Sequence, residues 1–178
     1  MSNHPPPGPS ASIHSVSKPE LDAFVKESAG SAASHTLRCR TVAEGRFRQS
    51  NYVRDLPAYS MEQRLGPSGD DLVPTPAEGL LAALGSCLAV GIHANAVARA
   101  IPIKSLHLDL EADFDLTAVW GVVNVNPQRI GFNNVRVTAH IEADAPRAVV
   151  EALVAHAVLW SPVSNTLYNP VHIEATVA

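Results

Sequence analysis

The chain has 178 residues, of which 46% are hydrophobic and only 5% aromatic, and its formal net charge is −4. This length fits one domain with a tail, and the apolar fraction supports a sizeable aliphatic core. The acidic balance argues against a nucleic-acid surface, which is normally basic. Only two cysteines occur and no signal peptide is visible, so we expect a reducing, cytoplasmic location without a disulfide framework.

The start of the chain is rich in proline and serine, and we expect residues 1–17 to be a disordered tail. Residues 18–178 are then expected to form a single domain. A short amphipathic helix is predicted from Pro19 to about Gly30. The next segment, residues 35–42, alternates in the manner of a strand, with Cys39 on its apolar face and therefore expected in the core.

The pattern after this first strand predicts a hairpin. Glu44 and Gly45 are suited to a turn, and the returning strand is expected at residues 46–53. Residues 55–75 hold prolines and glycines with little periodicity, which predicts a loop containing one short strand near residues 59–63.

The most apolar stretch of the chain predicts a helix from Pro76 to about Ala100. Thr75 and Glu78 have the spacing of a capping box, and proline suits the first helical position. Apolar or small residues occupy every side of this helix. Such a helix belongs in the centre of a protein rather than on its surface.

Cys87 lies near the middle of this central helix. A free cysteine at such a place is most often a buried structural residue. The apolar run is a poor membrane span, because His93, Asn95 and Arg99 interrupt it before a bilayer is crossed, and we expect no membrane association.

The second half of the chain alternates clearly. Residues 106–116 and 135–143 each place apolar side chains on one face and polar ones on the other, which predicts two half-buried strands paired antiparallel. Further elements are expected in this order: a loop or broken hairpin at 117–133, a helix at 146–160 with Asp144 as candidate cap, a short helical turn after Ser161-Pro162, and a last strand at 171–177. Antiparallel sheets with separate helices give an α+β class.

Two segments resemble the signatures of the OsmC/Ohr family. They are Thr75-Pro-Ala-Glu-Gly-Leu-Leu-Ala-Ala-Leu-Gly-Ser-Cys-Leu-Ala and, further downstream, Trp160-Ser-Pro-Val-Ser-Asn-Thr-Leu. The resemblance covers about Thr36 to Ala178. It implies an OsmC-like fold, with antiparallel sheets around long central apolar helices in an intertwined homodimer. It also implies reduction of organic hydroperoxides by a reactive cysteine, assisted by an arginine and a glutamate.

The resemblance assigns the reactive thiol to Cys87. The helix dipole acts mainly in the first turn, so a cationic neighbour must activate a thiol placed this far along the helix. Gly45-Arg46 resembles the family's Gly-Arg turn, which makes Arg46 the expected partner, with Arg48 and Arg54 as rivals. A guanidinium stays charged when desolvated and can hold a thiolate and a peroxide oxygen together.

The resemblance assigns the family's glutamate to Glu78, although the family's position would fall on Ala77, one residue earlier. Glu78 stands nine positions before Cys87, and about 100° per residue places the two on opposite sides of a regular helix. We therefore favour capping over catalysis for Glu78. Ser161 is the main departure, because related proteins carry a second cysteine there, and a serine cannot close a disulfide. Ser161 before Pro162 is also a sound helix cap.

The sequence predicts no cofactor and no metal. None of the eight histidines forms a His-x-His or His-x-x-x-His pair, and no Cys-x-x-Cys or glycine-rich phosphate loop occurs. Two functions stay open. The first is a single-cysteine thiol peroxidase in which an external thiol reductant resolves oxidised Cys87. The second is a non-catalytic dimer of the same fold that binds a small apolar ligand.

Overall fold

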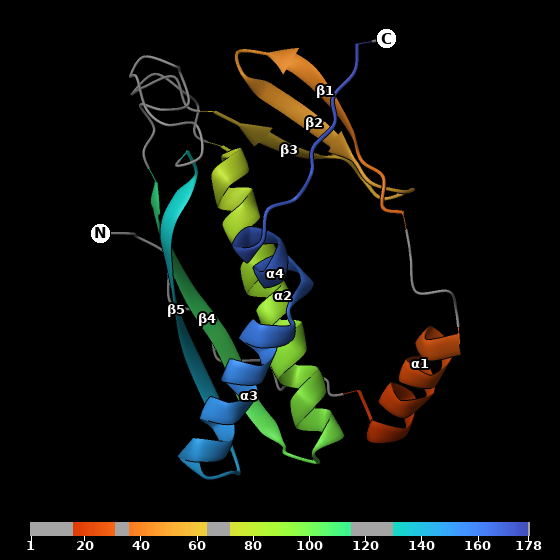
Figure 1. Ribbon diagram of the computed structural model, residues 1–178, viewed down its shortest axis with the longest axis vertical. Coiled ribbons are helices and arrows are strands. Elements are labelled where there is room, and N and C mark those ends of the chain that lie inside the picture. The colour runs from red at the N-terminus through yellow and green to blue at the C-terminus, as the bar shows by residue number, and fades with distance from the viewer. Residues whose placement is uncertain (1–15, 31–35, 64–71, 115–129, 178) are drawn as a thin grey trace. The chain divides into compact units, whose positions relative to one another are not determined.

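The structure of the protein is a computed structural model that describes residues 16–30, 36–63, 72–114 and 130–177. The chain divides into two compact units (Figure 1), which are treated separately below. The hairpin unit is Glu27–Ala83, and the helix-sheet unit combines Met1–Lys26 with Leu84–Ala178. The tail over 1–17 and the single domain over 18–178 stay predictions, since residues 1–15 lie outside the described part.

The predicted first helix is present as α1, Lys18–Gly30. The hairpin unit contains an antiparallel sheet in the order β1-β2-β3, which confirms the hairpin and the short third strand. Its strands are β1 (Arg40–Gly45), β2 (Arg48–Tyr52) and β3 (Tyr59–Glu62). The turn between β1 and β2 consists of Arg46 and Phe47, two residues later than the expected Glu44-Gly45, and their φ angles are +49° and +60°.

The expectation that Cys39 belongs to the core is wrong for this chain. The strand begins at Arg40 rather than at residue 35, because pairing with β2 ends at Arg40 opposite Tyr52. The residues before it have no strand partner among the described residues. Cys39 is accordingly exposed, and Leu37 is 92% exposed.

The central helix α2 runs from Pro76 to Ala98, close to the predicted bounds. Its first turn contains the expected capping box. The Thr75 amide donates to Glu78 Oε2 at 2.7 Å, and the Glu78 amide donates to Thr75 Oγ1 at 3.2 Å. Two orphan amides at the helix start are thus satisfied reciprocally.

The helix-sheet unit contains the second predicted sheet. Strands β4 (Ile103–Phe114) and β5 (Phe132–Ala143) pair antiparallel, as expected from their alternation. One face packs against the core, and the opposite face is exposed. The residues of the inner face are Leu106, Leu108, Leu110, Val135, Val137 and Ile141. The predicted loop at 117–133 falls largely outside the described residues.

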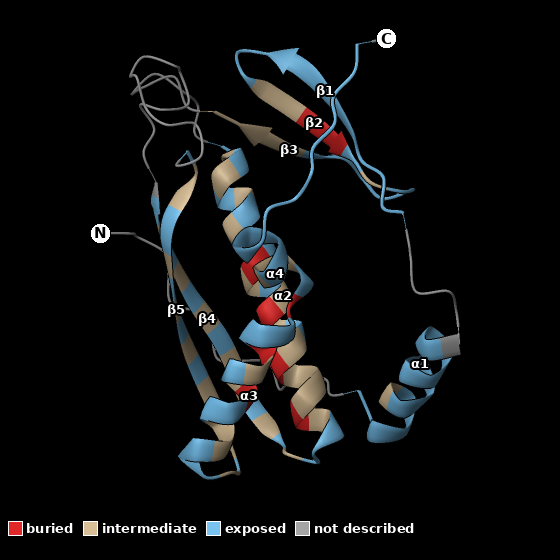
Figure 2. Cartoon of the chain, in the orientation of Figure 1, coloured by how far each residue is buried: buried red, intermediate tan, exposed pale blue. Residues whose placement is uncertain are grey.

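The core of this unit is a single stripe of α2 packed against α3, Arg147–Trp160 (Figure 2). Its buried apolar residues are Leu84, Leu88, Ile92 and Ala96 from α2 and Leu153 and Ala157 from α3. The stripe recurs every four residues, the spacing of neighbouring positions on one helix face. Other apolar positions of α2 are uncovered in the single chain, and Val90 is 69% exposed.

Two predictions about the end of the chain need correction. Asp144 does not cap α3, because its carboxylate accepts from Lys104 Nζ at 2.5 Å and Pro146 occupies the cap position. After α4 (Pro162–Tyr168), residues 171–177 form no strand. A strand requires a hydrogen-bonded neighbour, and no described strand of this chain pairs with this segment. Its apolar side chains are uncovered, and Ile173 is 84% exposed.

By length and composition, α2 is long and apolar enough to cross a membrane. The core helix of a soluble protein has the same properties, so this is weak evidence for a span. The buried stripe of α2 against α3 and the sheet gives its apolar composition a packing role.

Candidate active site

The helices α2 and α3 approach each other closely where Gly91 meets Ala157. A Cβ placed on Gly91 would lie 3.2 Å from the Ala157 Cβ, closer than ordinary van der Waals contact. Absence of a side chain at Gly91 therefore sets the distance between the two helices. Cys87 stands one turn before Gly91 on α2, and Ser161 stands one turn after Ala157 at the end of α3, so the two lie on the same side of this close approach.

The Ser161 hydroxyl donates a hydrogen bond to the sulfur of Cys87, with Oγ and Sγ 3.1 Å apart. Ser161 is only 4% exposed, whereas Cys87 is half-buried. The Cys87 thiol is thus partly accessible to solvent, whereas Ser161 is shielded from it. The two sequence motifs, which are distant along the chain, meet at this contact.

Ser161 is held in place by its position between α3 and α4. Its amide donates to the Ala157 carbonyl at 2.9 Å, and its hydroxyl accepts from the Ser164 amide at 3.0 Å as the N-cap of α4. Its carbonyl accepts from Asn165 Nδ2 at 2.9 Å. Because a lone pair of the hydroxyl is engaged by Ser164, the hydroxyl proton is available to the sulfur.

This arrangement suits a thiolate. A hydrogen bond donated to the charged form of a group stabilises that form, and the thiolate is the nucleophilic form of cysteine. Leu84 and Leu88, on the same helix, are buried beside the site.

The remaining predicted site residues lie in the hairpin unit. Glu78 forms the capping box described above, which gives it a structural role. Arg46 is exposed in the β1–β2 turn, and Arg48 lies 3.5 Å from a Glu44 carboxylate oxygen. Arg54 is also exposed, with a φ of +53°. Cys87 belongs to the helix-sheet unit, so its pairing with Arg46 stays a prediction.

Sequence reasoning missed His156 on α3. Its ring stacks on Trp160 with centroids 6.0 Å apart, and its buried Nδ1 has no hydrogen-bond partner among the described residues. No local motif marks this histidine. The sequence also gives no sign of the contact between the Ser161 hydroxyl and Cys87, because it indicates only a helix cap and a missing cysteine.

A groove of about 500 Å³ lies between β5 and α3. Apolar side chains line it, with one charged pair, Arg147 and Glu151, bonded at 2.7 Å. The apolar lining is Ala139, Ile141, Val150, Val154 and Ala155. The groove could hold a small apolar molecule.

Comparison with known proteins gives a consistent picture. Residues 69–176 match the family described as OsmC-like protein. No curated protein matches the chain. Among solved structures, an OsmC-like protein from Mycoplasma pneumoniae superposes with a TM-score of 0.64 at 15% identity, covering 76% of this chain and 89% of that one.

Two further structures are similar. An organic hydroperoxide resistance protein OsmC from Legionella pneumophila has a TM-score of 0.55 at 20% identity, over 76% of this chain and 91% of that one. An OsmC-like protein of unknown function from Vibrio cholerae has a TM-score of 0.62 at 9% identity, over 75% and 94%. At these identities the likeness shows the fold. Together with the family match over more than half of its residues, it shows that the chain has the α+β OsmC-like fold and belongs to the OsmC family.

Proposed function

We propose that this protein is a thiol-dependent peroxidase that reduces organic hydroperoxides through Cys87. The observation that carries the proposal is the 3.1 Å contact between Cys87 Sγ and Ser161 Oγ. It joins the two family motifs around a half-buried thiol that has a hydrogen-bond donor at its sulfur. The Legionella pneumophila relative, named as an organic hydroperoxide resistance protein, supports the same substrate class.

The proposed first step is attack of the Cys87 thiolate on the terminal oxygen of the hydroperoxide. A sulfur–oxygen bond forms and the oxygen–oxygen bond breaks. The alkoxide leaves and takes up a proton to become the alcohol, while the sulfur is oxidised by two electrons to a sulfenic acid. Ser161 stabilises the attacking thiolate, and Arg46 is the expected cation that holds the peroxide oxygen.

The proposed second step needs an external thiol, because Ser161 stands where the family's second cysteine would close a disulfide. One thiol condenses with the sulfenic acid, giving a mixed disulfide and water. A second thiol attacks that disulfide and releases reduced Cys87 together with the oxidised reductant. A dithiol reductant supplies both equivalents in one molecule.

The protein is further proposed to act as a homodimer. Its two-stranded β4–β5 sheet is a form that is marginal alone in water. Large apolar side chains are exposed on the helices and at the end of the chain, and a second copy of the chain would cover such side chains. The residues are Val90, Leu159, Trp160, Val171, Ile173 and Val177. Sedimentation of a stable folded monomer at micromolar concentration would contradict this assembly.

The decisive experiment is turnover of cumene hydroperoxide with a dithiol reductant. Wild type should consume the peroxide, Cys87→Ser should not, and Cys39→Ser should act near the wild-type rate, since Cys39 is exposed outside the helix-sheet unit. Mass spectrometry after peroxide treatment without reductant should find sulfenic and then sulfinic acid on Cys87. A Cys39–Cys87 crosslink would contradict the single-cysteine cycle.

The alternative is a non-catalytic protein that binds a small apolar ligand. The groove between β5 and α3 and the loss of the second cysteine favour it. Two results together would support this function. Wild type should show no peroxide turnover, and it should bind an apolar dye that the Val154→Glu variant does not bind. Equal dye binding by Val154→Glu would exclude the groove as its site.

A further inference from the structure

The exposed face of the β4–β5 sheet carries a cluster of three possible metal ligands. His107 and His140 stand directly opposite each other in the register, and Asp109 lies two residues along the same strand face. All three are exposed, on the opposite side of the sheet from the core. The three ligands are not closely spaced in the sequence, because His140 comes from the neighbouring strand.

The side chains of the cluster converge. The two imidazole rings stack with centroids 4.4 Å apart and planes 7° apart, and His140 Nε2 lies 3.0 Å from Asp109 Oδ2. One ligand atom from each residue lies within 4.8 Å of the others. A tetrahedral zinc ion with bonds of about 2.1 Å has ligand atoms roughly 3.4 Å apart. The lone pairs of two nearly parallel rings do not converge, so at least one imidazole must rotate out of the stack for all three groups to reach one ion.

We propose that His107, Asp109 and His140 form a binding site for a divalent transition-metal ion, with Zn²⁺ as its probe. Two imidazole nitrogens and one carboxylate oxygen suit zinc and its neighbours, whereas Mg²⁺ and Ca²⁺ prefer oxygen ligands. Water would complete the coordination, since the cluster is exposed and Thr138 opposite Asp109 is small. This proposal is independent of the chemistry at Cys87.

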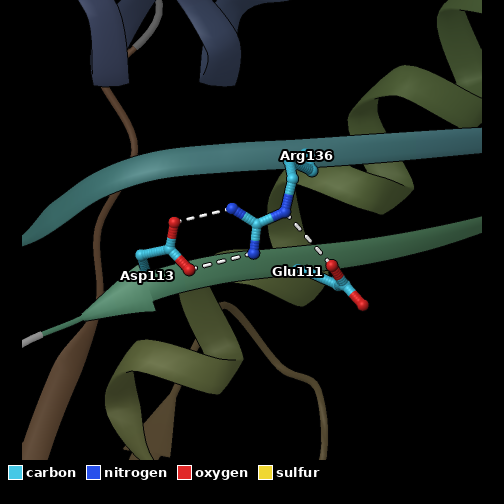
Figure 3. Close-up of polar contacts among 3 residues, drawn as sticks. All are labelled: Glu111, Asp113 and Arg136. Atoms are coloured by element: carbon cyan, nitrogen blue, oxygen red, sulfur yellow. Dashed lines mark hydrogen bonds and ion pairs between the residues drawn. The ribbon is translucent and has the colours of Figure 1, made fainter.

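The electrostatics of this face favour a cation. Arg136 is the nearby positive charge, and Glu111 and Asp113 hold it (Figure 3). Its guanidinium donates to both Asp113 carboxylate oxygens, at 2.6 and 2.9 Å, and to Glu111 at 3.2 Å. Arg136 is thus directed away from Asp109. The two carboxylates together carry more charge than the one guanidinium, so these three groups leave a net negative charge on the face that carries the cluster.

The backbone beneath the cluster is regular. The irregularities of the β4–β5 pairing fall between Ile103 and Ser105 and between Asp113 and Phe114, on either side of the ligands. The ligand positions are therefore fixed by continuous cross-strand hydrogen bonds. A bound ion would link the two strands and stabilise the sheet, because binding to the folded state alone raises stability.

The test is zinc binding by the full chain without a polyhistidine tag, in a Cys39→Ser/Cys87→Ser background that removes both thiols. Titration calorimetry with ZnCl₂ should give one ion per chain, and MgCl₂ should give no heat of binding. Loss of even an outer-shell partner typically weakens metal binding about 10–100-fold. His107→Asn and His140→Asn should each therefore weaken zinc binding at least about tenfold. His172→Asn, an exposed histidine outside the cluster, should bind like its parent.

A second measurement guards against misfolded variants. Zinc should raise the melting temperature of the parent and of His172→Asn but not of the two cluster variants, and circular dichroism should show that all of them are folded. The proposal is overturned if the parent takes up no zinc at millimolar concentration. It is equally overturned if folded His107→Asn and His140→Asn bind zinc as tightly as the parent.

Discussion

The Ser161 hydroxyl lies 3.1 Å from the sulfur of Cys87 while its own oxygen accepts the Ser164 amide. One side chain thus caps α4 and solvates the thiol. The cap fixes the direction of the hydroxyl, so the donor at the sulfur is already in place before any substrate arrives. Preorganised donors of this kind cost no reorganisation during a reaction.

Ser161→Ala should affect both roles. Loss of an N-cap side chain costs about 1 kcal/mol of stability, and chemical denaturation will measure it. Loss of the donor should also slow alkylation of Cys87 by iodoacetamide at neutral pH. Ser161→Thr keeps the hydroxyl and is the matched control. Equal alkylation rates for the alanine variant and wild type would show that the hydrogen bond does not support the thiolate.

Ser161→Cys should restore a disulfide with Cys87. The two side-chain atoms are already in contact, and the substituted thiol would resolve the sulfenic acid within the chain. Peroxide treatment should then give a crosslinked peptide in mass spectrometry, and turnover with a dithiol should rise. Cys39→Ser in the same background controls for the other thiol. Failure to crosslink would mean that the site lacks disulfide geometry.

The capping box separates the two roles considered for Glu78. Thr75→Ala removes the cap and should lower the free energy of unfolding by about 1 kcal/mol. Glu78→Gln keeps a capping-box residue but removes the charge, so stability and peroxide turnover should both stay near wild type. A large fall in turnover for Glu78→Gln, at unchanged stability, would assign Glu78 to catalysis.

Gly91→Val should force α2 and α3 apart, since even a Cβ there would lie 3.2 Å from Ala157. Overpacking of this kind costs about 1–3 kcal/mol. It should also separate Cys87 from Ser161 and slow peroxide turnover. Ala98→Val, exposed at the end of α2, controls for the β-branched side chain. Similar melting temperatures for the two variants would contradict close packing at Gly91.

The ion pair on the outer sheet face gives a pH prediction. Hydrogen bonds from Arg136 hold the pKa of Asp113 below its usual value. Its stabilising effect is therefore present above the unfolded pKa and is lost as the pH falls through the folded one. Arg136→Gln should raise the pKa of Asp113 in a carboxyl NMR titration. Arg147→Gln, which breaks an exposed pair on α3, should leave it unchanged.

The sequence predicted well where local pattern decides the structure. The capping box located the start of α2, and strict alternation located β4 and β5. The sequence predicted poorly where the structure of a segment depends on which other element packs or pairs with it. The alternation at 171–177 indicates an apolar face but not which strand would pair with it, and Cys39 shares an apolar pattern with Leu37 without any described element to cover it.

The candidate site shows the same division. Two motifs identified Cys87 and Ser161, but only the crossing of α2 and α3 at Gly91 brings them into contact. The pairing of His107 with His140 likewise needs the register of two strands. Alternation predicts that strands pair, and a shift of register by two residues would keep every face and separate these histidines.

The turn at Arg46 and Phe47 has a consequence for how this hairpin could be engineered. Both residues have positive φ, a conformation that costs an ordinary side chain about 1–2 kcal/mol and that Asn and Gly adopt readily. A hairpin selected for folding strength alone would carry Asn-Gly at its tip. Because Arg46 and Phe47 stand there instead, the turn carries this conformational cost. Replacing the two residues by Asn-Gly should therefore stabilise the hairpin.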